Sequence, residues 1–492
     1  MAERTAPARE VTPPAGPRRV WRRWAWIGLG LLAFTIIRLA PLPAVGTEQV
    51  TISEAGQASF AVVALCLILW VSEAIPIAVT SLAIFLLMPA LGVASISETI
   101  QSGLGHPLIL FFLSLFLISA AFEKVGLGRR VSNSILARSR GSSGRLLLWM
   151  LSVGALLSMS VNALAAVTVL FGTAQQICRD TGHSMRKSNF SRRLFLAASY
   201  GPLIGSIGTP LGTGSNILTI AYLETLAARQ VSFLEWMALG VPLVLLLLPL
   251  AWLILMRAFP DDERAPQAPS LEANREPLRR NEVIFLVIFG AALFCWIFGP
   301  GLNQLSGGRL ALSLEYVGLA AAFSLFLPGI DLLTWEEAER AIHKGTLLSV
   351  AGGLAAGVLL YQSGTALWLS ALLLQDLPAA SPGQVLILVL AVVFVLRLLF
   401  TTSTAAVALL TPLVITVAQR LGTDPWLLAM AASFVINLAF VLPIQAAVHL
   451  IAYSAGHYSS RDMARGGVWL SVLAVVLIGL LAFVLGLTRK LF

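Results

Sequence analysis

Two short polar segments interrupt apolar stretches of this chain, and they lie about half the chain apart. The sequence SMSVN at 158–162 runs into Ala-Ala-Val at 165–167, and TTST at 401–404 runs into Ala-Ala-Val at 405–407, 240 residues later. Irregular backbone survives at membrane depth only where it is buried in protein or lines a wet cavity. The matched segments therefore predict two related halves that build one polar site together.

A second pair of interruptions repeats this relation. The sequence GTPLGTGSN at 208–216 corresponds to LPIQAAVH at 442–449, and a weaker similarity links FEKVG at 122–126 to LYQSG at 360–364. Glycine- and proline-rich breaks at matched positions of two halves are typical of a binding site near the bilayer midplane of a secondary transporter.

The composition agrees with a membrane protein. Of the 492 residues, 58% are hydrophobic and only 12% are charged, with a mean hydropathy of +0.86, whereas ordinary soluble domains carry about 25% charged residues. Many apolar runs reach the ~20 residues that span a bilayer as a helix. We therefore predict an all-α polytopic membrane protein. The three cysteines are scattered, so we expect neither a disulfide framework nor a metal cluster.

The positive charges are distributed unevenly, which predicts an orientation. Of 33 Lys and Arg residues, six lie in the tail 1–23 and twenty lie in five loops, at 124–145, 179–193, 257–280, 331–344 and 457–466. Such a bias marks the cytoplasmic side and places the N-terminus there, in the inner (plasma) membrane. The net charge of +9 is thereby explained without a nucleic-acid partner.

The hydropathy pattern predicts about 11 membrane helices and two re-entrant hairpins, arranged as an inverted repeat of about five spans plus one hairpin each. A disordered tail and an extra first helix precede the repeats, and a cytoplasmic linker separates them. In order, the expected parts are the tail 1–23, the first helix 24–46, repeat 1 at 57–256 (hairpin 146–178, broken helix 194–225), the linker 257–281 and repeat 2 at 282–488 (a continuous span 345–372, hairpin 383–420, broken helix 425–456).

The polar tips are candidate substrate ligands. Helix N-termini carry partial positive charge and free N–H donors, so helices that begin near 165 and 405 would suit a small anion. The alternative is that Ser and Thr in membrane helices only bond neighbouring helices. We predict that substrate contacts involve Ser160, Asn162, Thr402, Ser403 and Thr404.

The breaks supply candidates for cation binding or for shaping the site, since their glycines and prolines exclude a continuous helix. A simple kink is the alternative. The candidate residues are Ser158, Gly208, Thr209, Gly212, Thr213, Asn216, Pro443, Ala446 and His449.

Three ionisable residues stand out in apolar surroundings. Arg397 lies about two turns before the second tip, where it either binds the anion or extends to the lipid interface. His449 is either a neutral, hydrogen-bonded histidine or part of the second break. Glu73 more simply caps a helix than carries a proton. No phosphate-binding GxxxxGK[ST], HExxH or GxSxG motif occurs, so neither ATP-driven transport nor an enzyme is expected, and no cofactor beyond Na⁺ or H⁺.

Several longer motifs resemble the divalent anion/sodium symporter family. VSEAIPIAVT at 71–80 is similar to the family's V-T-E-A-I-P-L-A-V-T segment, and EKVGLGRR at 123–130 to its E-K-x-G-L-x-x-R run. IGTPLGT at 207–213 resembles its first broken-helix loop, and RDMARGG at 461–467 the x-D-M-x-x-x-G start of its last span. In order, these motifs cover most of the chain from about 57 to 488.

The resemblance implies a homodimeric secondary transporter with scaffold and transport domains. Such proteins move dicarboxylates, citrate or sulfate, usually with Na⁺, by an elevator-like motion. The family's S-N-T tips fall here on residues 162–164 and 402–404, and its T-P-P-N loop on 446–449. These positions match only in part, because Ala163, Leu164 and Ala446 lack side-chain oxygens, and we therefore expect weakened Na⁺ dependence.

We predict a cation-coupled transporter of a small anion, most simply a di- or tricarboxylate. The alternatives are an H⁺-coupled or uncoupled permease for sulfate, another inorganic oxyanion or arsenite, and a transporter-like membrane receptor. A receptor would need a soluble signalling domain, for which the tail and the short loops offer little room.

Overall fold

The computed structural model describes residues 17–46, 49–128, 130–131, 142–180, 188–260, 277–307, 309, 312–374 and 381–489. Within these ranges the chain forms α-helices and two three-residue 3-10 helices, and no β-strand. Nine of the helices described are long and apolar enough to cross a membrane, and five further apolar helices have 10–17 residues. The predicted all-α polytopic fold is confirmed.

The helix α1 (Pro17–Leu39) precedes the elements of the two halves of the chain. The first half contains α2 (Glu54–Ser72), α3 (Ile77–Ala90), α4 (Ile96–Ser102), α5 (Pro107–Val125), α7 (Ser143–Ser160), α8 (Ala163–Asp180), α9 (Asn189–Gly205), η1 (Pro210–Gly212), α10 (Gly214–Ala227) and α11 (Phe233–Ala258). The second half contains α12 (Arg280–Leu305), α13 (Leu314–Ser324), α14 (Trp335–Ala341), α15 (Lys344–Gln362), α16 (Thr365–Leu374), α17 (Pro382–Arg397), α18 (Ser403–Arg420), α19 (Pro425–Asn437), η2 (Pro443–Gln445), α20 (Ala447–Ser454) and α21 (Ser460–Arg489).

Each half has a pair of helices that meet at a polar tip, followed by a broken helix. The pairs α7–α8 and α17–α18 coincide with the two predicted hairpins, and α9–η1–α10 and α19–η2–α20 with the two predicted broken helices. That both ends of a hairpin lie on one side of the membrane, and that the halves are inverted, stay predictions.

Two boundaries predicted from the sequence are wrong. Helix α1 begins at Pro17 and ends at Leu39, about seven residues before the predicted 24–46 at each end, because Pro41 and Pro43 cannot continue a helix. Residues 1–16 of the expected tail, and 261–276 of the linker, lie outside the described residues. The predicted continuous span 345–372 is divided into α15 and α16 at Gly364, whose φ of +80° is left-handed.

Two short helices, α4 and α14, connect longer ones, and α14 lies in the predicted loop 331–344. A capping box starts each of them, Ser95 with Glu98 before α4 and Thr334 with Glu337 before α14. Glu337 also accepts a hydrogen bond from Lys124 at the end of α5 (2.5 Å), which lowers the pKa of its carboxyl. This contact joins the two halves at the surface.

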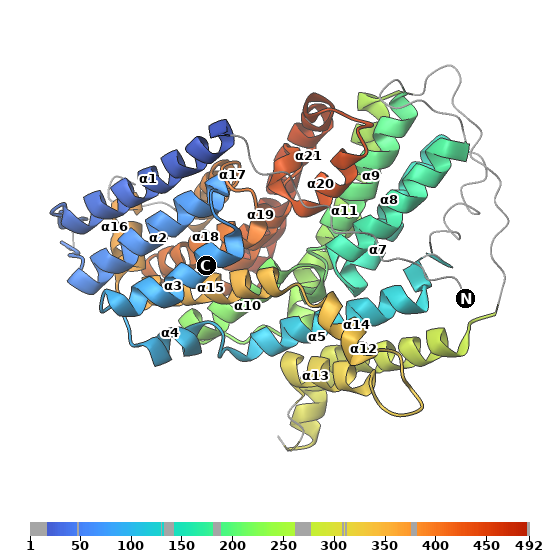
Figure 1. The fold of residues 1–492 in the computed structure, drawn as a ribbon, viewed down its shortest axis with the longest axis horizontal. Coiled ribbons are helices and arrows are strands. Elements are labelled where there is room, and N and C mark those ends of the chain that lie inside the picture. Colours follow the sequence, from blue (N-terminus) through green and yellow to red (C-terminus); the bar gives the residue numbers. More distant parts are fainter. Residues whose placement is uncertain are drawn as a thin grey trace.

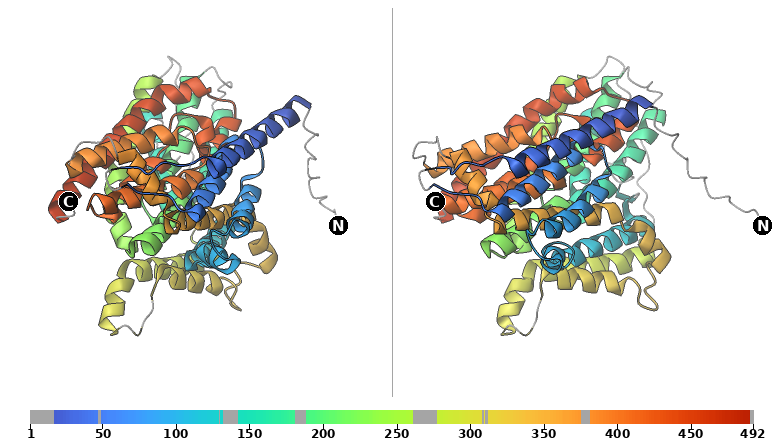
Figure 2. Two further views of the ribbon diagram at one scale, coloured as in Figure 1. Left: turned by 90° about the vertical axis from the view of Figure 1, so that its left-hand side faces the viewer. Right: turned by 60° about the vertical axis from the view of Figure 1, so that its left-hand side comes forward.

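The hairpins pack reciprocally across the halves. Helices α7 and α8 pack against α9, α17 and α18 pack against α19, and each second arm also contacts the second arm of the other half's broken helix, α8 with α20 and α18 with α10. In Figure 1, α7, α8, α9, α20 and α21 lie together on one side, and α1 lies along α2 on the other. Both views of Figure 2 place α12 and α13 at the lower end, away from α1.

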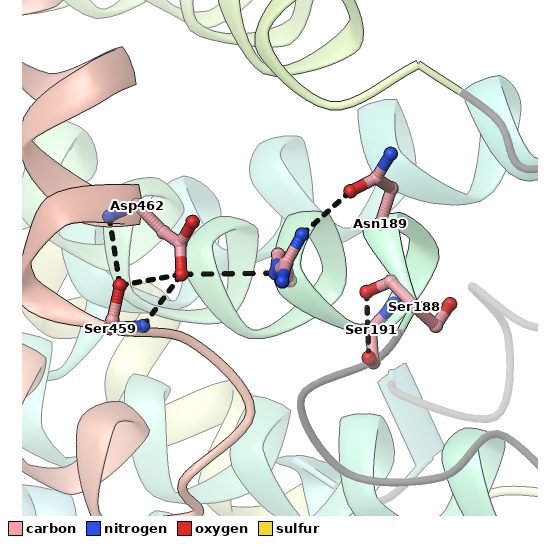
Figure 3. A network of polar contacts seen from close by, with 6 residues as sticks. Ser188, Asn189, Ser191, Ser459 and Asp462 are labelled. Atoms are coloured by element: carbon pink, nitrogen blue, oxygen red, sulfur yellow. Dashed lines mark hydrogen bonds and ion pairs between the residues drawn. The ribbon is translucent and has the colours of Figure 1, made fainter.

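A polar network joins the start of α9 to the start of α21 (Figure 3). Asp462 accepts hydrogen bonds from the backbone N–H and the hydroxyl of Ser459, at 2.8 and 2.7 Å, which caps α21. The Arg192 guanidinium lies 3.7 Å from the Asp462 carboxylate and donates to Asn189. The motif at 461–467 therefore anchors the last helix to the first broken helix.

Candidate functional site

A cavity of about 240 Å³ lies where the tips and the breaks of both halves meet. Polar lining comes from the tips, the breaks and the start of α15, and the phenyl rings of Phe112 and Phe116 on α5 form an apolar wall. Its lining residues are Phe112, Leu115, Phe116, Asn162, Ala163, Leu164, Leu203, Ser206, Leu211, Gly212, Thr213, Gly214, His343, Thr346, Thr402, Ser403, Thr404, Asn437, Ala446, Ala447 and Val448. Among the described residues that line the cavity, His343 alone has an ionisable side chain.

Four helix N-termini converge on this cavity. Helices α8, α10, α18 and α20 begin at 163, 214, 403 and 447, and the first residues of all four line it. The N-caps of α10 and α20, Thr213 and Ala446, make no side-chain capping bond, so neither N-cap side chain satisfies the first N–H groups of its helix. Free N–H donors and the helix dipole favour an anion at such a place.

The first tip is held by Asn162. Its side-chain oxygen accepts from the N–H of Ala165 (2.9 Å), which caps α8, and its amide nitrogen donates to the Ser119 hydroxyl (3.2 Å). Asn162 is therefore fixed from both sides while it lines the cavity. Behind it, Thr209 of the break donates to the carbonyl of Met159 (2.7 Å), which ties the tip to the break.

The second tip is held by Arg397, the last residue of α17. Its guanidinium donates to the carbonyls of Ile436 and Phe400, both at 2.6 Å, and of Gln445 at 2.5 Å. A fourth bond of 3.3 Å reaches the hydroxyl of Ser403. Arg397 is 2% exposed, so it does not extend to the lipid interface. It stands behind the tip and does not line the cavity.

Two asparagines join the broken helices behind the cavity. Asn216 donates to the carbonyls of Ser206 (2.7 Å) and Thr209 (3.0 Å) and accepts from Asn437 (2.9 Å). Ser215 completes the link by donating to the side-chain oxygen of Asn437 (2.5 Å). A fully satisfied buried network of this kind fixes backbone that no regular helix supports.

The predicted site residues divide into two groups. Asn162, Thr402, Ser403, Thr404, Gly212, Thr213 and Ala446 line the cavity. Ser158, Ser160, Gly208, Thr209, Asn216, Arg397, Pro443 and His449 lie outside its lining.

The residues outside the lining have identifiable surroundings. The Ser160 hydroxyl bonds to the Leu156 carbonyl of its own helix (2.9 Å), and buried His449 bonds to the Ala439 carbonyl (2.8 Å). Thr402, which does line the cavity, caps α18 by accepting from the N–H of Ala405 (3.2 Å). The functional roles assigned to all these residues stay predictions.

Sequence reasoning missed Asn437, His343 and Thr346, which also line the cavity. Asn437 could have been found, because it is a lone amide in the apolar run 426–442 of a predicted span. His343 and Thr346 come from the start of α15, and their sequence surroundings resemble an ordinary basic loop.

A second cavity of about 480 Å³ adjoins the first. The two share Thr346, Thr402 and Thr404, so the tip of the second hairpin separates them. Glu73 and Arg23 also line the second cavity. Glu73 ends α2 in a left-handed conformation (φ 49°), which agrees with the expectation that it finishes a helix turn.

The long apolar helices and the cavity between the broken helices indicate a multi-pass membrane protein. A model of the family described as "Sodium:sulfate symporter transmembrane region" matches residues 21–488. The chain belongs to this family, which confirms the resemblance found in its motifs. It is therefore a secondary transporter by family, and not an enzyme.

Curated relatives are similar over most of their length. The "Sodium-dependent dicarboxylate transporter SdcS" of Staphylococcus saprophyticus is 28% identical over 438 residues, which covers 85% of this chain and 83% of the relative. The protein of the same name in Staphylococcus aureus (strain bovine RF122 / ET3-1) is 29% identical over 435 residues and covers 84% and 83%.

Two solved structures share the fold at low sequence identity. The YdaH transporter of Alcanivorax borkumensis has a TM-score of 0.54 at 16% identity, covering 96% of this chain and 99% of the other. MtrF of Neisseria gonorrhoeae has a TM-score of 0.55 at 13% identity, covering 94% of each chain. Both support the architecture alone.

Proposed function

We propose that this chain is a secondary active transporter of a small anion, most simply a di- or tricarboxylate. The observation that carries the proposal is the convergence of four helix N-termini on one cavity of about 240 Å³. Oriented N–H donors stabilise negative charge without a permanent cation in the lining. The names of the staphylococcal relatives support a dicarboxylate.

The substrate ligands in this proposal are the tip residues that line the cavity: Asn162, Thr402, Ser403 and Thr404. Their amide and hydroxyl groups complement the N–H groups of α8 and α18. Arg397 acts from behind the second tip, whereas Ser160 bonds within its own helix. The breaks at 208–216 and 442–446 shape the site, and the first of them offers oxygens to a coupling cation.

The proposed coupling ion is Na⁺, with H⁺ as the alternative. The family description and the relatives' names favour Na⁺. In the first half, the buried hydroxyl of Ser158 has no hydrogen-bond partner among the described residues and could serve as an oxygen ligand. We expect weaker Na⁺ dependence than in the relatives, because Ala163, Leu164 and Ala446 bring no side-chain oxygen to the cavity.

Transport by an elevator-like motion, a homodimer and a plasma-membrane location with a cytoplasmic N-terminus complete the proposal. The basic loops support the orientation. The reciprocal packing of the two hairpins supports a repeat.

Sulfate or another inorganic oxyanion is the second candidate substrate class. The family description names sulfate, and the small volume of the cavity suits a compact anion as well as a dicarboxylate. Arsenite and a receptor function have no comparable support.

Uptake into proteoliposomes tests the proposal. Radiolabelled succinate, citrate and sulfate are offered with and without an inward Na⁺ gradient, and with a pH gradient as a third condition. We expect succinate or citrate uptake above empty liposomes. Uptake of sulfate alone would establish the second candidate, and binding without uptake of any of the three would favour a receptor.

Cysteine labelling tests the inverted hairpins. In a background without Cys66, Cys178 and Cys295, single cysteines replace Arg145, at the start of the first hairpin, and Leu421, at the end of the second. A membrane-impermeant maleimide should label residue 145 only from the cytoplasm and residue 421 only from outside. Labelling of both from the same side would end the inverted-repeat proposal.

A further inference from the structure

The guanidinium of Arg397 lies in a group of four oxygen acceptors, which we call the second-half oxygen cluster. It consists of the carbonyls of Phe400, Ile436 and Gln445 and the hydroxyl of Ser403, at 2.5–3.3 Å. Phe400 and Ser403 belong to the tip of the second hairpin, whereas Ile436 lies at the end of α19, just before the second break, and Gln445 lies within that break. Neutral carbonyl and hydroxyl oxygens from several segments are the ligands that hard cations take.

The charge of Arg397 is balanced by these oxygens and not by an acid. Among the described residues, no carboxylate forms an ion pair with it, and its side chain is 2% exposed. A buried charge without a counter-ion is costly, and in membrane segments such residues mark functional sites. Its position at the C-terminal end of α17 recovers part of this cost through the helix dipole.

The first half lacks such a charge. The residue 240 positions before Arg397 is Leu157, which is buried and apolar. At the offset of 233 residues that aligns the breaks, the counterparts of Ile436 and Gln445 are Leu203 and Gly212, and the Leu203 carbonyl accepts from the neutral hydroxyl of Ser206 (2.7 Å). Among the described residues, the two halves therefore share a tip and a break and differ in charge at the joint between them.

We propose that Arg397 is a tethered cation that permanently occupies the second-half oxygen cluster, so that this half has no site for an exchangeable cation. The inference rests on the proposed anion transport and concerns its coupling. The Ser403 hydroxyl both lines the cavity and accepts from Arg397, so the fixed charge lies directly behind the anion. It supplies at all times the charge that a co-transported cation would supply only when bound.

This arrangement limits cation dependence to the first half. The contribution of the second half to the anion affinity should not depend on the Na⁺ concentration. The number of coupled cations is reduced accordingly, and any Na⁺ activation should follow a Hill coefficient of about 1, because Hill coefficients do not exceed the number of interacting sites.

The test removes the tethered charge and offers a free one. Arg397→Ala is compared with Arg397→Lys and with the wild type, in uptake assays and in thermal unfolding of the purified protein. Choline, Na⁺ or millimolar guanidinium is the added cation. In choline we expect Arg397→Ala to lose on the order of 10-fold or more in apparent anion affinity, since several buried acceptors lose their donor. Na⁺ or guanidinium should restore uptake by Arg397→Ala and raise the unfolding temperature of this variant.

The matched Arg397→Lys variant keeps a tethered charge, so its Na⁺ response should equal that of the wild type even if its maximal rate falls. The proposal is overturned by a folded Arg397→Ala that neither cation rescues or stabilises. It is also overturned by an Arg397→Lys that acquires a new Na⁺ requirement, or by wild-type Na⁺ activation with a Hill coefficient clearly above about 1. If Arg397→Ala does not fold, the Na⁺ response of Arg397→Lys and the Hill coefficient of the wild type still test the proposal.

The stability measurement separates this inference from the proposed function. If the wild type transports none of the three test anions, the proposed function fails. Cation-dependent stabilisation of Arg397→Ala, absent from the wild type at the same guanidinium concentration, would still support a tethered cation in the oxygen cluster.

Discussion

The joints between tip and break in the two halves use different chemistry to hold similar backbone. In the first half, the neutral side chains of Asn216 and Thr209 satisfy the break and tip carbonyls. In the second half, the charged guanidinium of Arg397 takes three carbonyls, and the imidazole of His449 takes a fourth, that of Ala439.

This difference shows that two related joints can share backbone geometry and still contribute to binding in different ways. Both joints bring a helix N-terminus to the same cavity. Only the second carries a permanent positive charge behind its tip, so the two halves should respond differently to ions and to substitution. The predictions below test that asymmetry.

The largest effect is expected for Asn216→Ala compared with His449→Phe. Asn216 makes three buried hydrogen bonds, whereas His449 makes one through its side chain, and its Nδ1 has no partner among the described residues. Each buried group left unsatisfied costs about 1–3 kcal/mol. We expect Asn216→Ala to lose several times more stability in thermal unfolding, with little or no uptake.

His449→Phe is the matched control, because it keeps a ring of similar size and removes a single bond. It should fold and retain measurable uptake. Equal destabilisation by both variants would mean that the second joint depends on His449 as strongly as the first depends on Asn216.

These joints also show what the sequence could and could not predict. The breaks were predictable because proline and glycine exclude helix, and the tips because polar residues in apolar runs stand out. The partners of Arg397 were not, since three of its four acceptors are backbone carbonyls, which carry no sequence signal. The sequence suggested either anion binding or extension to the interface, and burial among carbonyls excludes the second.

The next largest effect concerns the tips. Asn162→Ala and Ser403→Ala should each lower the apparent anion affinity about 5- to 150-fold, which corresponds to the ~1–3 kcal/mol of one unpaired polar partner. Asn162→Ala should also reduce stability by about 1 kcal/mol, because its oxygen caps α8. Ser403→Ala removes only an acceptor of Arg397 and should leave stability nearly unchanged. Uptake kinetics and thermal unfolding separate the two effects.

Ser160→Ala sharpens this prediction. The Ser160 hydroxyl bonds within its own helix and does not line the cavity, so we now expect uptake close to that of the wild type. A loss of anion affinity as large as that of Asn162→Ala would mean that Ser160 binds the substrate, as predicted from the sequence. Wild-type affinity in both tip variants would instead leave the tips as packing elements.

A smaller loss of stability, of equal size in the two halves, is expected at the glycine that follows α5 and at the glycine between α15 and α16. Gly126 and Gly364 have φ of +81° and +80°, and no atom lies within 4 Å of an added Cβ. Alanine at either position should therefore cost only the backbone strain, about 1–2 kcal/mol, in thermal unfolding. Unequal losses would show that the halves differ here too. Gly172→Ala, inside α8 with open space around it, should not destabilise and serves as control.

The same glycines explain a partial success of the sequence analysis. The similarity of 122–126 to 360–364 correctly aligned two positions at which a helix ends in the left-handed region. It did not predict the division of the span 345–372, because the residues after Gly364 are as apolar as those before it. Hydropathy cannot locate a turn that is made by one backbone conformation.

The smallest effects are expected at the starts of the last helices of the two halves, α11 and α21. Each begins with a serine capping box whose acid faces an arginine: Glu235 lies 2.8 Å from Arg229, and Asp462 lies 3.7 Å from Arg192. Glu235→Gln and Asp462→Asn retain an amide oxygen for the cap and remove the charge. Exposed ion pairs contribute about 0–1 kcal/mol, so both losses should be below about 1 kcal/mol.

The ion pair of the first half should matter more, because Arg229 donates a hydrogen bond to Glu235 while Arg192 is only within electrostatic range of Asp462. Thermal unfolding at low salt should rank Glu235→Gln as more destabilising than Asp462→Asn. Both differences from the wild type should shrink in ~1 M salt, where the Debye length is about 3 Å. The reverse order would mean that the contact of Asp462 with Arg192 on the distant α9 contributes more stability than the contact of Glu235 with Arg229, six residues away. The second half would then depend more on charged side chains at the surface, as it does at the site.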